Sequence, residues 1–341
     1  YDNELKTGFI INGTIRNLIG KSSRLLLSVD VSENPKMNIH YYKYIGTKEN
    51  YWFTTQFYTD RNIITTYENG NILGDLINNY SFLKLGINRT LNINSYAQIY
   101  LSLNSSNLEE RASAKLFYTD GEFSKIKEKY LSIGFESSKN TTKQRYFPKS
   151  GKIVLFKYGM HLNINSKTKL DNGNESYHVE NLPMHRFQID VRNYKTISKK
   201  ITFNTTIRGS GILDNNYLIS EQQYGGGLDR PMRNLIEFDG YRNYELGGAY
   251  ALAFKTELQF EAYRNIYLQS RINYGVFSNS FDKFFTNVLN PIYNLDLASF
   301  HTFSYGINLA TLSPLGPIQI GFGEAYPLNK TRFYFSFGHK F

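Results

Sequence analysis

Apolar and polar side chains alternate with a period of two along most of this chain, most clearly over the last eleven residues. Phe333, Phe335, Phe337 and Phe341 fall on one face there, opposite Arg332, Tyr334, Ser336, Gly338 and Lys340. Successive side chains of a strand point to opposite sides of a sheet, so this segment has one apolar and one polar face. The same alternation recurs at 25–31, 186–192, 251–260, 268–276, 304–310 and 318–323. An apolar face toward lipid and a charged face toward a wet lumen are typical of outer-membrane barrels, whereas a soluble sandwich would bury an apolar core.

Fifteen candidate strands follow from this alternation. They span 5–16, 23–32, 36–45, 51–60, 78–90, 96–104, 129–138, 151–164, 184–195, 200–212, 247–262, 266–279, 299–311, 317–324 and 331–341. Short connections lie at 17–23, 46–50, 197–200, 262–265 and 312–317, and long ones at 61–77, 105–128, 165–183, 213–246 and 280–298. Bacterial barrels have short periplasmic turns and long surface loops, so the C-terminus is expected at the periplasmic side.

The predicted fold class is therefore all-β: a transmembrane antiparallel β-barrel of the sixteen-strand type, with fifteen strands in this chain. An even strand number is expected because an open edge within lipid would leave backbone groups unpaired. A sixteenth strand before residue 1 would supply it, which makes residues 1–341 the barrel domain of a larger protein. A miscounted strand is the alternative.

The alternation also assigns side chains to faces. Lipid contact is expected for Phe303, Ile307, Ile320, Phe335 and Phe337, and a lumenal position for Arg208, Lys255, Glu257, Arg271 and Arg332.

Composition agrees with a barrel in the outer membrane. Aromatic residues reach 16%, with 28 Tyr and 25 Phe, which suits the aromatic girdles at the two membrane interfaces. No apolar run is long enough for a transmembrane helix. The net charge is +10, and the Lys and Arg are spread over strand faces and loops rather than clustered. This distribution favours attraction to anionic lipid head groups, or a position in a solvated lumen, over binding to nucleic acid.

Motifs for catalysis or metal binding are missing from the sequence. There is no G-x-S-x-G for a serine hydrolase, and the six His are scattered without metal-ligand spacing. Zero Cys excludes disulfides and Cys-ligated metals. We therefore expect no catalytic residues, no metal and no cofactor in this chain.

Five segments, in order, resemble the BamA/TamA superfamily of outer-membrane barrels. They are RNLIGKSSRLLLSVD (16–30), RYFPKSG (145–151), the stretch from QYGGGLDR to ELQF (223–260), LSPLGPIQIGF (312–322) and FSFGHKF (335–341). The first three look like the first periplasmic turn with the strand after it, a YFP-x-x-G turn, and the long sixth surface loop with its following strand. The last two together look like the last hairpin. The resemblance implies a C-terminal assembly signal at Phe335, Phe337, Gly338 and Phe341.

In that family the sixth loop folds into the lumen and carries a V-R-G-F-like tetrad, whose Arg docks on acidic residues of the next two strands. The matching tetrad here is Phe238-Asp239-Gly240-Tyr241, so an acid stands at the Arg position. The family's acidic partners would fall near Gln259 and Asn273, which are both neutral. Asp239 is expected to reach Arg271 or Lys255 instead, and a solvated Asp in a surface loop is the alternative.

This departure argues against an essential assembly insertase. The glycines at 225–227 and the strands around 262–275 look more like the barrel of patatin-type (type Vd) autotransporters. The leading hypothesis is a barrel that anchors and translocates an attached patatin-like phospholipase, a serine lipid acyl hydrolase lying upstream. A BamA/TamA-type insertase is the second hypothesis and a passive diffusion pore the third. Expected partners are outer-membrane phospholipid and lipopolysaccharide, the outer-membrane assembly machinery and the chain's own passenger.

Overall fold

The computed structural model describes most of the chain, and the structural statements below concern these residues. They are 8–46, 49–68, 71–112, 123–170, 174–180, 182–213, 218–227, 233–284, 299–314 and 316–338.

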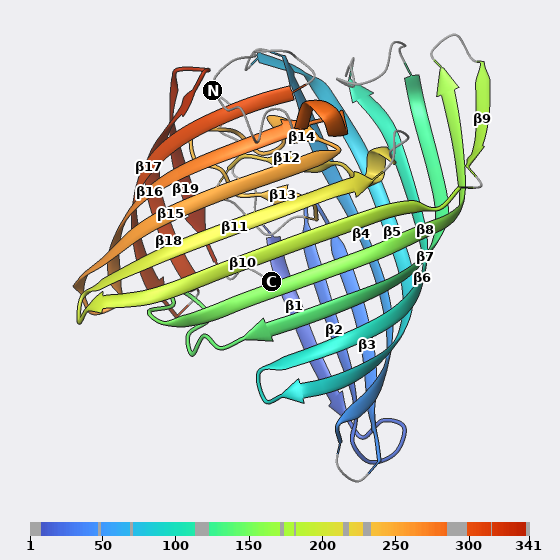
Figure 1. Cartoon of the computed structure of the whole chain (residues 1–341), viewed down its shortest axis with the longest axis horizontal. Helices are drawn as coiled ribbons and strands as arrows, with labels where there is room; N and C mark the ends of the chain where they lie inside the picture. The colour runs from blue at the N-terminus through green and yellow to red at the C-terminus, as the bar shows by residue number, and fades with distance from the viewer. Residues whose placement is uncertain are drawn as a thin grey trace. The chain divides into compact units, whose positions relative to one another are not determined.

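A large antiparallel sheet accounts for most of these residues (Figure 1). Its strands follow one hydrogen-bonded order, β1-β2-β3-β4-β5-β6-β7-β8-β10-β11-β15-β16-β17-β18-β19. Their bounds are β1 Gly8–Arg16, β2 Ser23–Ser32, β3 Lys36–Ile45, β4 Tyr51–Glu68, β5 Asn71–Asn92, β6 Ser95–Ala112, β7 Phe123–Asn140, β8 Gly151–Leu170, β10 Met184–Ser198, β11 Ile201–Leu213, β15 Tyr250–Tyr263, β16 Ile266–Ser278, β17 Ser299–Ser313, β18 Gly316–Tyr326 and β19 Lys330–Phe337. All fifteen predicted strands are therefore confirmed, and in sequence order.

Several strands run much further than predicted. The β5–β6 hairpin stays paired from Asn92↔Ser95 to Asp75↔Ala112, through segments expected to be loops at 61–77 and 105–128. The apolar alternation stops near the middle of these strands, but cross-strand backbone hydrogen bonds do not need an apolar face to continue. Alternation therefore located the apolar band of each strand and underestimated the lengths of β4 to β8.

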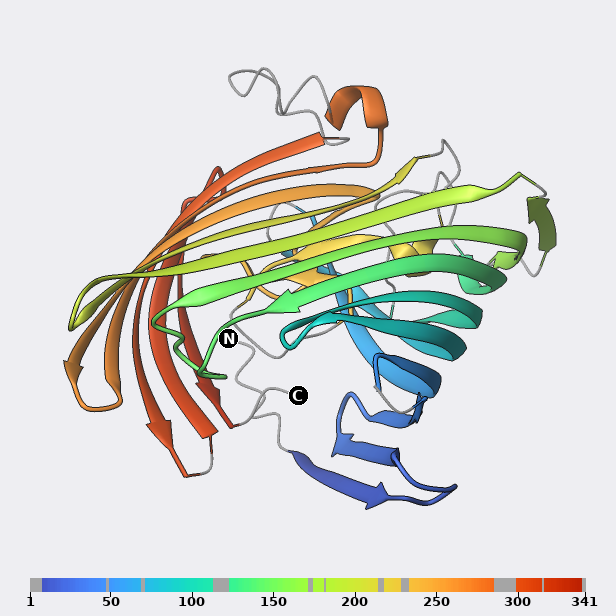
Figure 2. The same ribbon diagram turned by 60° about the horizontal axis from the view of Figure 1, so that its bottom comes forward.

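The predicted long loops at 165–183 and 213–246 also contain strands. β9 (Glu175–Glu180) pairs with the distal part of β8, beside the main order of strands. A small separate sheet of β12 (Gln223–Gly225), β13 (Leu235–Ile236) and β14 (Leu246–Gly248) begins within 213–246 and ends two residues beyond it. Helix among the described residues is limited to the 3-10 turn η1 (Ile219–Glu221) and a short helix at 281–284, which Figure 2 shows beyond the end of β16.

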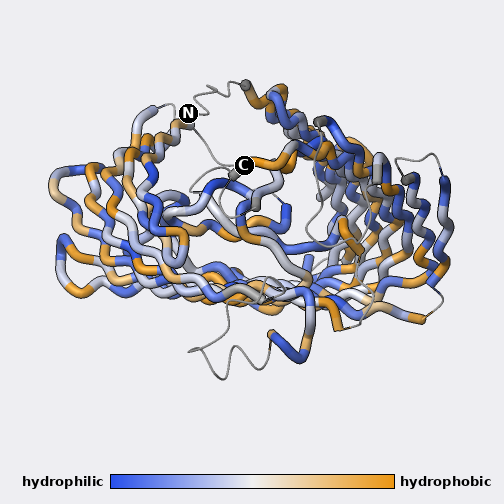
Figure 3. The backbone as a smooth tube through the Cα atoms, turned by 90° about the horizontal axis from the view of Figure 1, so that it is seen from above, coloured by the Kyte–Doolittle hydropathy of each residue, from blue (hydrophilic) through white to orange (hydrophobic). Residues whose placement is uncertain are grey.

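The two faces of the strands differ in polarity as predicted, and Figure 3 shows the alternation along the backbone. The five residues expected at lipid, Phe303, Ile307, Ile320, Phe335 and Phe337, are exposed. On the opposite, inner face Glu257 and Arg271 are buried, while Arg208, Lys255 and Arg332 are partly buried. Among the described residues, no helix has the length and apolar character needed to cross a membrane.

The chain divides into two compact units. The first comprises Tyr1–Thr66, Ile72–Ser137 and Tyr158–His185, and the second Tyr67–Asn71, Ser138–Lys157 and Arg186–Phe341. The sixth loop, the strands that it touches and the turn at 145–151 all belong to the second unit, so the site described below lies within one unit.

Replacing Phe335 by Arg is expected to destabilise the folded chain in a bilayer, because a cation in lipid loses its hydration; the cost is about 2–4 kcal/mol at the membrane midplane and smaller toward the interface. Phe335 is 57% exposed on the apolar face of β19. The matched control is Ser336→Arg, which places the same side chain on the inner face of the same strand. Unfolding titrations in lipid vesicles would measure both, and equal stability of the two variants would contradict the assignment of faces.

Candidate functional site

The sixth loop is a structured element with its own backbone pairing. β12 pairs with β13 in parallel and with β14 antiparallel. Three further backbone bonds bring the two arms of the loop together: Gly226 N to Ile236 O at 3.0 Å, Gly227 N to Tyr241 O at 2.7 Å and Phe238 N to Gly227 O at 3.1 Å. These bonds present the tetrad Phe238-Asp239-Gly240-Tyr241 as a fixed tip.

The two aromatic residues of the tetrad pack into a buried apolar cluster. Phe238 and Tyr241 have ring centroids 5.8 Å apart, and Phe238 also lies 6.3 Å from Phe277 of β16. The cluster includes Ile236 and Leu246 from the loop and Ala251, Ala253 and Ala325 from the strands. Because Phe238 and Tyr241 are almost completely buried, the tip is docked against the inner face rather than exposed to solvent.

Small residues on β16, β17 and β18 make room for the tip. A Cβ at Gly275 would lie 2.8 Å from the Phe238 ring, and one at Gly306 would lie 2.7 Å from Asp239 Oδ1. Gly240 itself has φ +78°, and a Cβ there would lie 2.6 Å from the backbone nitrogen of Ala325. The docked position of the tip thus requires glycine both in the tetrad, at Gly240, and on the strands, at Gly275 and Gly306, because only glycine allows so close an approach.

Tyr241 is anchored by its hydroxyl as well as by its ring. The hydroxyl accepts a hydrogen bond from Thr302 Oγ1 at 2.6 Å and donates one to the Tyr326 carbonyl at 3.2 Å. The Tyr334 hydroxyl of β19 donates to the Tyr241 carbonyl at 3.2 Å. Burial raises the pKa of Tyr241, so the phenol keeps the proton that it donates.

Asp239 lies within this docked tip and is 1% exposed. Asn273 Nδ2 of β16 donates to Asp239 Oδ2 at 2.7 Å, and Arg271 Nη1 lies 3.8 Å from Asp239 Oδ1. The nearer partner of Arg271 is Glu257 of β15, whose Oε2 accepts from Arg271 Nε at 2.7 Å. The structure therefore brings Asp239, Asn273 and Arg271 together, and it adds Glu257, which sequence reasoning left out of the site.

Lys255 and Gln259 have other partners. Lys255 Nζ lies 3.5 Å from Oε2 of Glu237, the residue just before the tetrad. Gln259 accepts a hydrogen bond from Gln269 Nε2 of the neighbouring strand β16 at 3.1 Å. Of the two cations proposed as partners of Asp239, only Arg271 lies at ion-pair distance among the described contacts.

A second ion pair joins the loop to the last strand. Arg332 of β19 forms a two-pronged pair with Glu245, its Nη2 lying 2.8 Å from Glu245 Oε1 and its Nη1 contacting Oε2. Glu245 also accepts a hydrogen bond from the Arg242 backbone N–H at 2.8 Å. Glu245 and Arg332 are 87 positions apart in sequence, and no local sequence pattern predicts that they pair.

A double-mutant cycle with Glu245→Gln and Arg332→Gln is expected to give a coupling free energy of about 2 kcal/mol, because both groups are largely buried and the fork is two-pronged. Denaturant titrations of the four proteins would measure it. The exposed pair Lys167–Glu175 offers a control cycle, and its coupling should be much smaller because solvent screens it. A coupling at Glu245–Arg332 as small as the control would contradict the anchor.

The turn at 145–151 packs on the other end of the same strands. Phe147 has φ +49° and is buried against Tyr267 and Ala310, with a centroid distance of 4.8 Å to Tyr267. Lys149 Nζ donates to Glu261 Oε2 at 2.6 Å, and this hydrogen bond raises the pKa of Lys149. The YFP-x-x-G-like segment is thus a folded element that covers the ends of β16 and β17.

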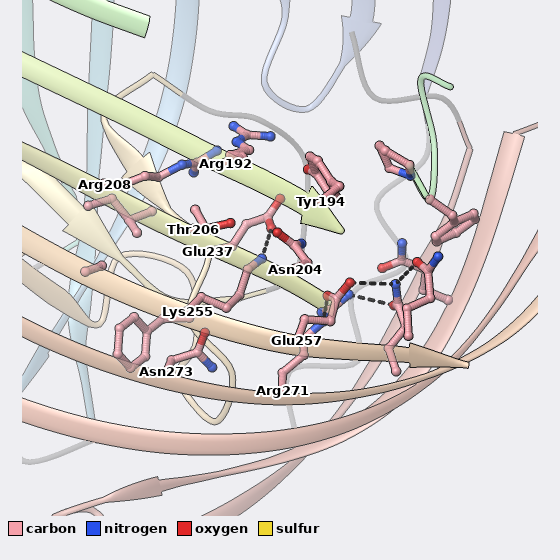
Figure 4. A pocket seen from close by; sticks show the side chains of 18 of the residues that line it. Arg192, Tyr194, Asn204, Thr206, Arg208, Glu237, Lys255, Glu257, Arg271 and Asn273 are labelled. Carbon is pink, nitrogen blue, oxygen red and sulfur yellow. Dashed lines mark hydrogen bonds and ion pairs between the residues drawn. The ribbon is translucent and has the colours of Figure 1, made fainter. Parts of the chain in front are cut away.

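A cavity of about 150 Å³ lies between the docked loop and this turn (Figure 4). Its walls come from the inner faces of β10, β11, β15 and β16, with Glu237 and Phe238 from the loop and Phe147 and Pro148 from the turn. The side chains labelled in Figure 4 are mainly polar or charged. Within the described part of the chain, no group of three or more His, Asp or Glu side chains could hold a metal ion.

The residues of the proposed C-terminal signal divide between described and undescribed positions. Phe335 and Phe337 lie on the exposed face of β19, and Gly338 N donates to the Pro317 carbonyl at 3.0 Å. Phe341 lies outside the described residues.

Comparison with known proteins identifies relatives of this arrangement. The Omp85 superfamily domain matches residues 17–341. A BamA from Haemophilus ducreyi lacking POTRA domains 1–3 superposes with a TM-score of 0.70 at 13% identity, covering 97% of this chain and 68% of that one. No curated protein sequence matches significantly.

Two further solved structures are also similar. CdiB from Acinetobacter baumannii gives a TM-score of 0.57 at 13% identity, over 97% of this chain and 56% of that one. CdiB from Escherichia coli gives 0.56 at 10% identity, over 98% of this chain and 57% of that one. The chain thus spans just over half the length of the CdiB chains that it resembles. With the sheet described above, these likenesses confirm the predicted fold class, an outer-membrane β-barrel.

Proposed function

This chain belongs to the Omp85 superfamily, and on that premise we propose that it anchors and translocates an attached patatin-like phospholipase domain in the bacterial outer membrane. The chain itself acts as the barrel, and catalysis belongs to a domain upstream of residue 1. Its C-terminus lies at the periplasmic side. Its partners are the surrounding phospholipid and lipopolysaccharide, the assembly machinery that inserts it and its own passenger.

The observation that carries this proposal is the reversed charge of the docked tetrad. The loop contributes the carboxylate of Asp239, and the strands contribute Asn273 and Arg271. A superfamily insertase is expected to carry the cation on the loop and the acids on the strands. The reversal therefore favours a barrel that serves its own passenger over an insertase that assembles other proteins, which is the second candidate.

The docked tetrad supports the same choice over a passive diffusion pore. Porins lack such a loop and the ordered segments that resemble the superfamily. The resemblance to patatin-type barrels, carried by the glycines at 225–227, the tetrad at 238–241 and the segment 262–275, suggests the nature of the passenger.

The test uses the full-length parent protein in its own bacterium. Deleting the segment 1–341 should remove a lipid acyl hydrolase activity from the outer-membrane fraction, while the levels of other outer-membrane proteins stay unchanged. A general loss of outer-membrane proteins would instead support the insertase. An upstream region without a hydrolase domain would overturn the patatin passenger.

A further inference from the structure

We propose that the cavity beneath the docked loop binds a phosphate group, either as the free anion or on a small phosphate ester. The proposal concerns the chemistry of the cavity wall and does not depend on the identity of the passenger.

The wall of the cavity carries an excess of positive charge. Five cationic side chains line it, Arg145, Arg192, Arg208, Lys255 and Arg271, against two carboxylates, Glu237 and Glu257. Glu257 accepts from Arg271 at 2.7 Å and Glu237 lies 3.5 Å from Lys255. Two further carboxylates contact the lining cations: Asp190 binds Arg192 and Arg208, and Asp239 lies 3.8 Å from Arg271. The positive excess therefore lies on the side of Arg192 and Arg208, which share one carboxylate.

Two of these cations share a single carboxylate. Arg192 donates to Asp190 through Nε at 3.0 Å and Nη2 at 2.8 Å, and Arg208 donates to the same carboxylate through Nε at 2.9 Å. Each guanidinium has five N–H donors in a fixed fork. Asp190 takes two from Arg192 and one from Arg208, so most of the donors remain for neighbouring groups and for a ligand.

The arrangement places three cations around one space. Arg192 on β10, Arg208 on β11 and Lys255 on β15 come from consecutive strands of the sheet, and Thr206 is in register with Lys255 (Figure 4). The side chains of Arg192 and Arg208 keep 31% and 21% of their surface accessible. Guanidinium forks held in place by Asp190 suit the several oxygens of a phosphate group, and the Thr206 hydroxyl adds a neutral donor.

Enclosure strengthens these interactions and sets the size of the ligand. Residues of the loop and of the turn at 145–148 both line the cavity, so charge–charge attraction within it is less screened than on a flat surface. A volume of about 150 Å³ is roughly five times the volume of one water molecule in the liquid, which is enough for a phosphate group.

The experiment measures phosphate binding to the whole folded chain in detergent micelles by isothermal titration, with ionic strength held constant by chloride. Inorganic phosphate and glycerol 3-phosphate are titrated separately, which distinguishes the free anion from an ester. We expect saturable binding of at least one, and a loss of affinity of at least about tenfold in the double variant Arg192→Gln, Arg208→Gln. Arg24→Gln on β2, in the first unit and outside the cavity, is the matched control and should bind like the wild type.

A second variant protects the test against misfolding. Lys255→Gln leaves the partners of Asp190 in place and should also weaken binding, while heat-modified mobility on gels reports whether each variant is folded. The proposal is overturned if the folded wild type shows no saturable binding of either probe, or if Arg24→Gln loses as much affinity as the cavity variants.

Discussion

Replacing Asp239 by Arg is expected to lower the free energy of unfolding of the barrel by about 3–5 kcal/mol. The new cation would face Arg271, which lies 3.8 Å from the present carboxylate, and would lose the hydrogen bond from Asn273. It would also have no space, because Asp239 already sits against Gly306. Urea titrations and the temperature at which the folded gel band disappears would measure the loss.

Asp239→Asn is the matched control for this prediction. Asn keeps the size of the side chain and an oxygen that accepts from Asn273, so most of the stability should remain. If Asp239→Arg unfolds like Asp239→Asn, the tetrad is not held by its polar contacts and the docked tip contributes little.

The structure also predicts which second substitution should compensate Asp239→Arg. Arg271→Glu would restore an opposite charge to Asp239→Arg, but it would also place a second carboxylate beside Glu257, which now lies 2.7 Å from Arg271. Recovery of stability is therefore expected only when Arg271→Glu is combined with Glu257→Gln.

Replacing Gly240 by Ala is expected to cost about 2–4 kcal/mol in the free energy of unfolding. The left-handed backbone, with φ +78°, contributes about 1 kcal/mol for a residue with a Cβ. The remainder is overpacking, because the Cβ would lie 2.6 Å from backbone atoms of Glu324 and Ala325 that cannot rotate away. Denaturant unfolding of the folded chain in detergent would measure it.

Gly46→Ala separates the two contributions. Gly46 has the same φ of +78°, but nothing lies within 4 Å of its Cβ position. It should therefore show the backbone cost alone. Equal destabilisation by the two substitutions would mean that the close approach of Gly240 to β18 is not energetically important.

The membrane-facing side of the fold could be predicted from the sequence. Lipid requires an apolar side chain at every second position, so Phe303, Ile307, Phe335 and their equivalents marked each strand and its exposed face. The polar extensions of β5 to β8 and the short strand β9 could not be predicted in this way. A strand with water on both faces needs no apolar side chains on either, so its sequence shows no alternation.

Part of the site could also have been recognised from the sequence. Glu257 and Arg271 are directly opposite in the β15–β16 hairpin, whose two strands had been assigned correctly, so their pairing follows from register. The tetrad was located through the family resemblance. Its contact with Arg271 is predictable because the alternation places that residue on the inner face.

By itself, then, the sequence determined the fifteen strands of the main sheet and, within their apolar bands, the face that each side chain occupies, because these depend on a two-residue period and on the solvent at each face. Only the tertiary structure decided how the sixth loop docks. Glu245 meets Arg332, Gly240 lies against Ala325, and Lys255 turns to Glu237 rather than to Asp239. Such contacts join residues far apart in sequence through a loop without periodicity, so their energies depend on a three-dimensional fit that no local pattern encodes.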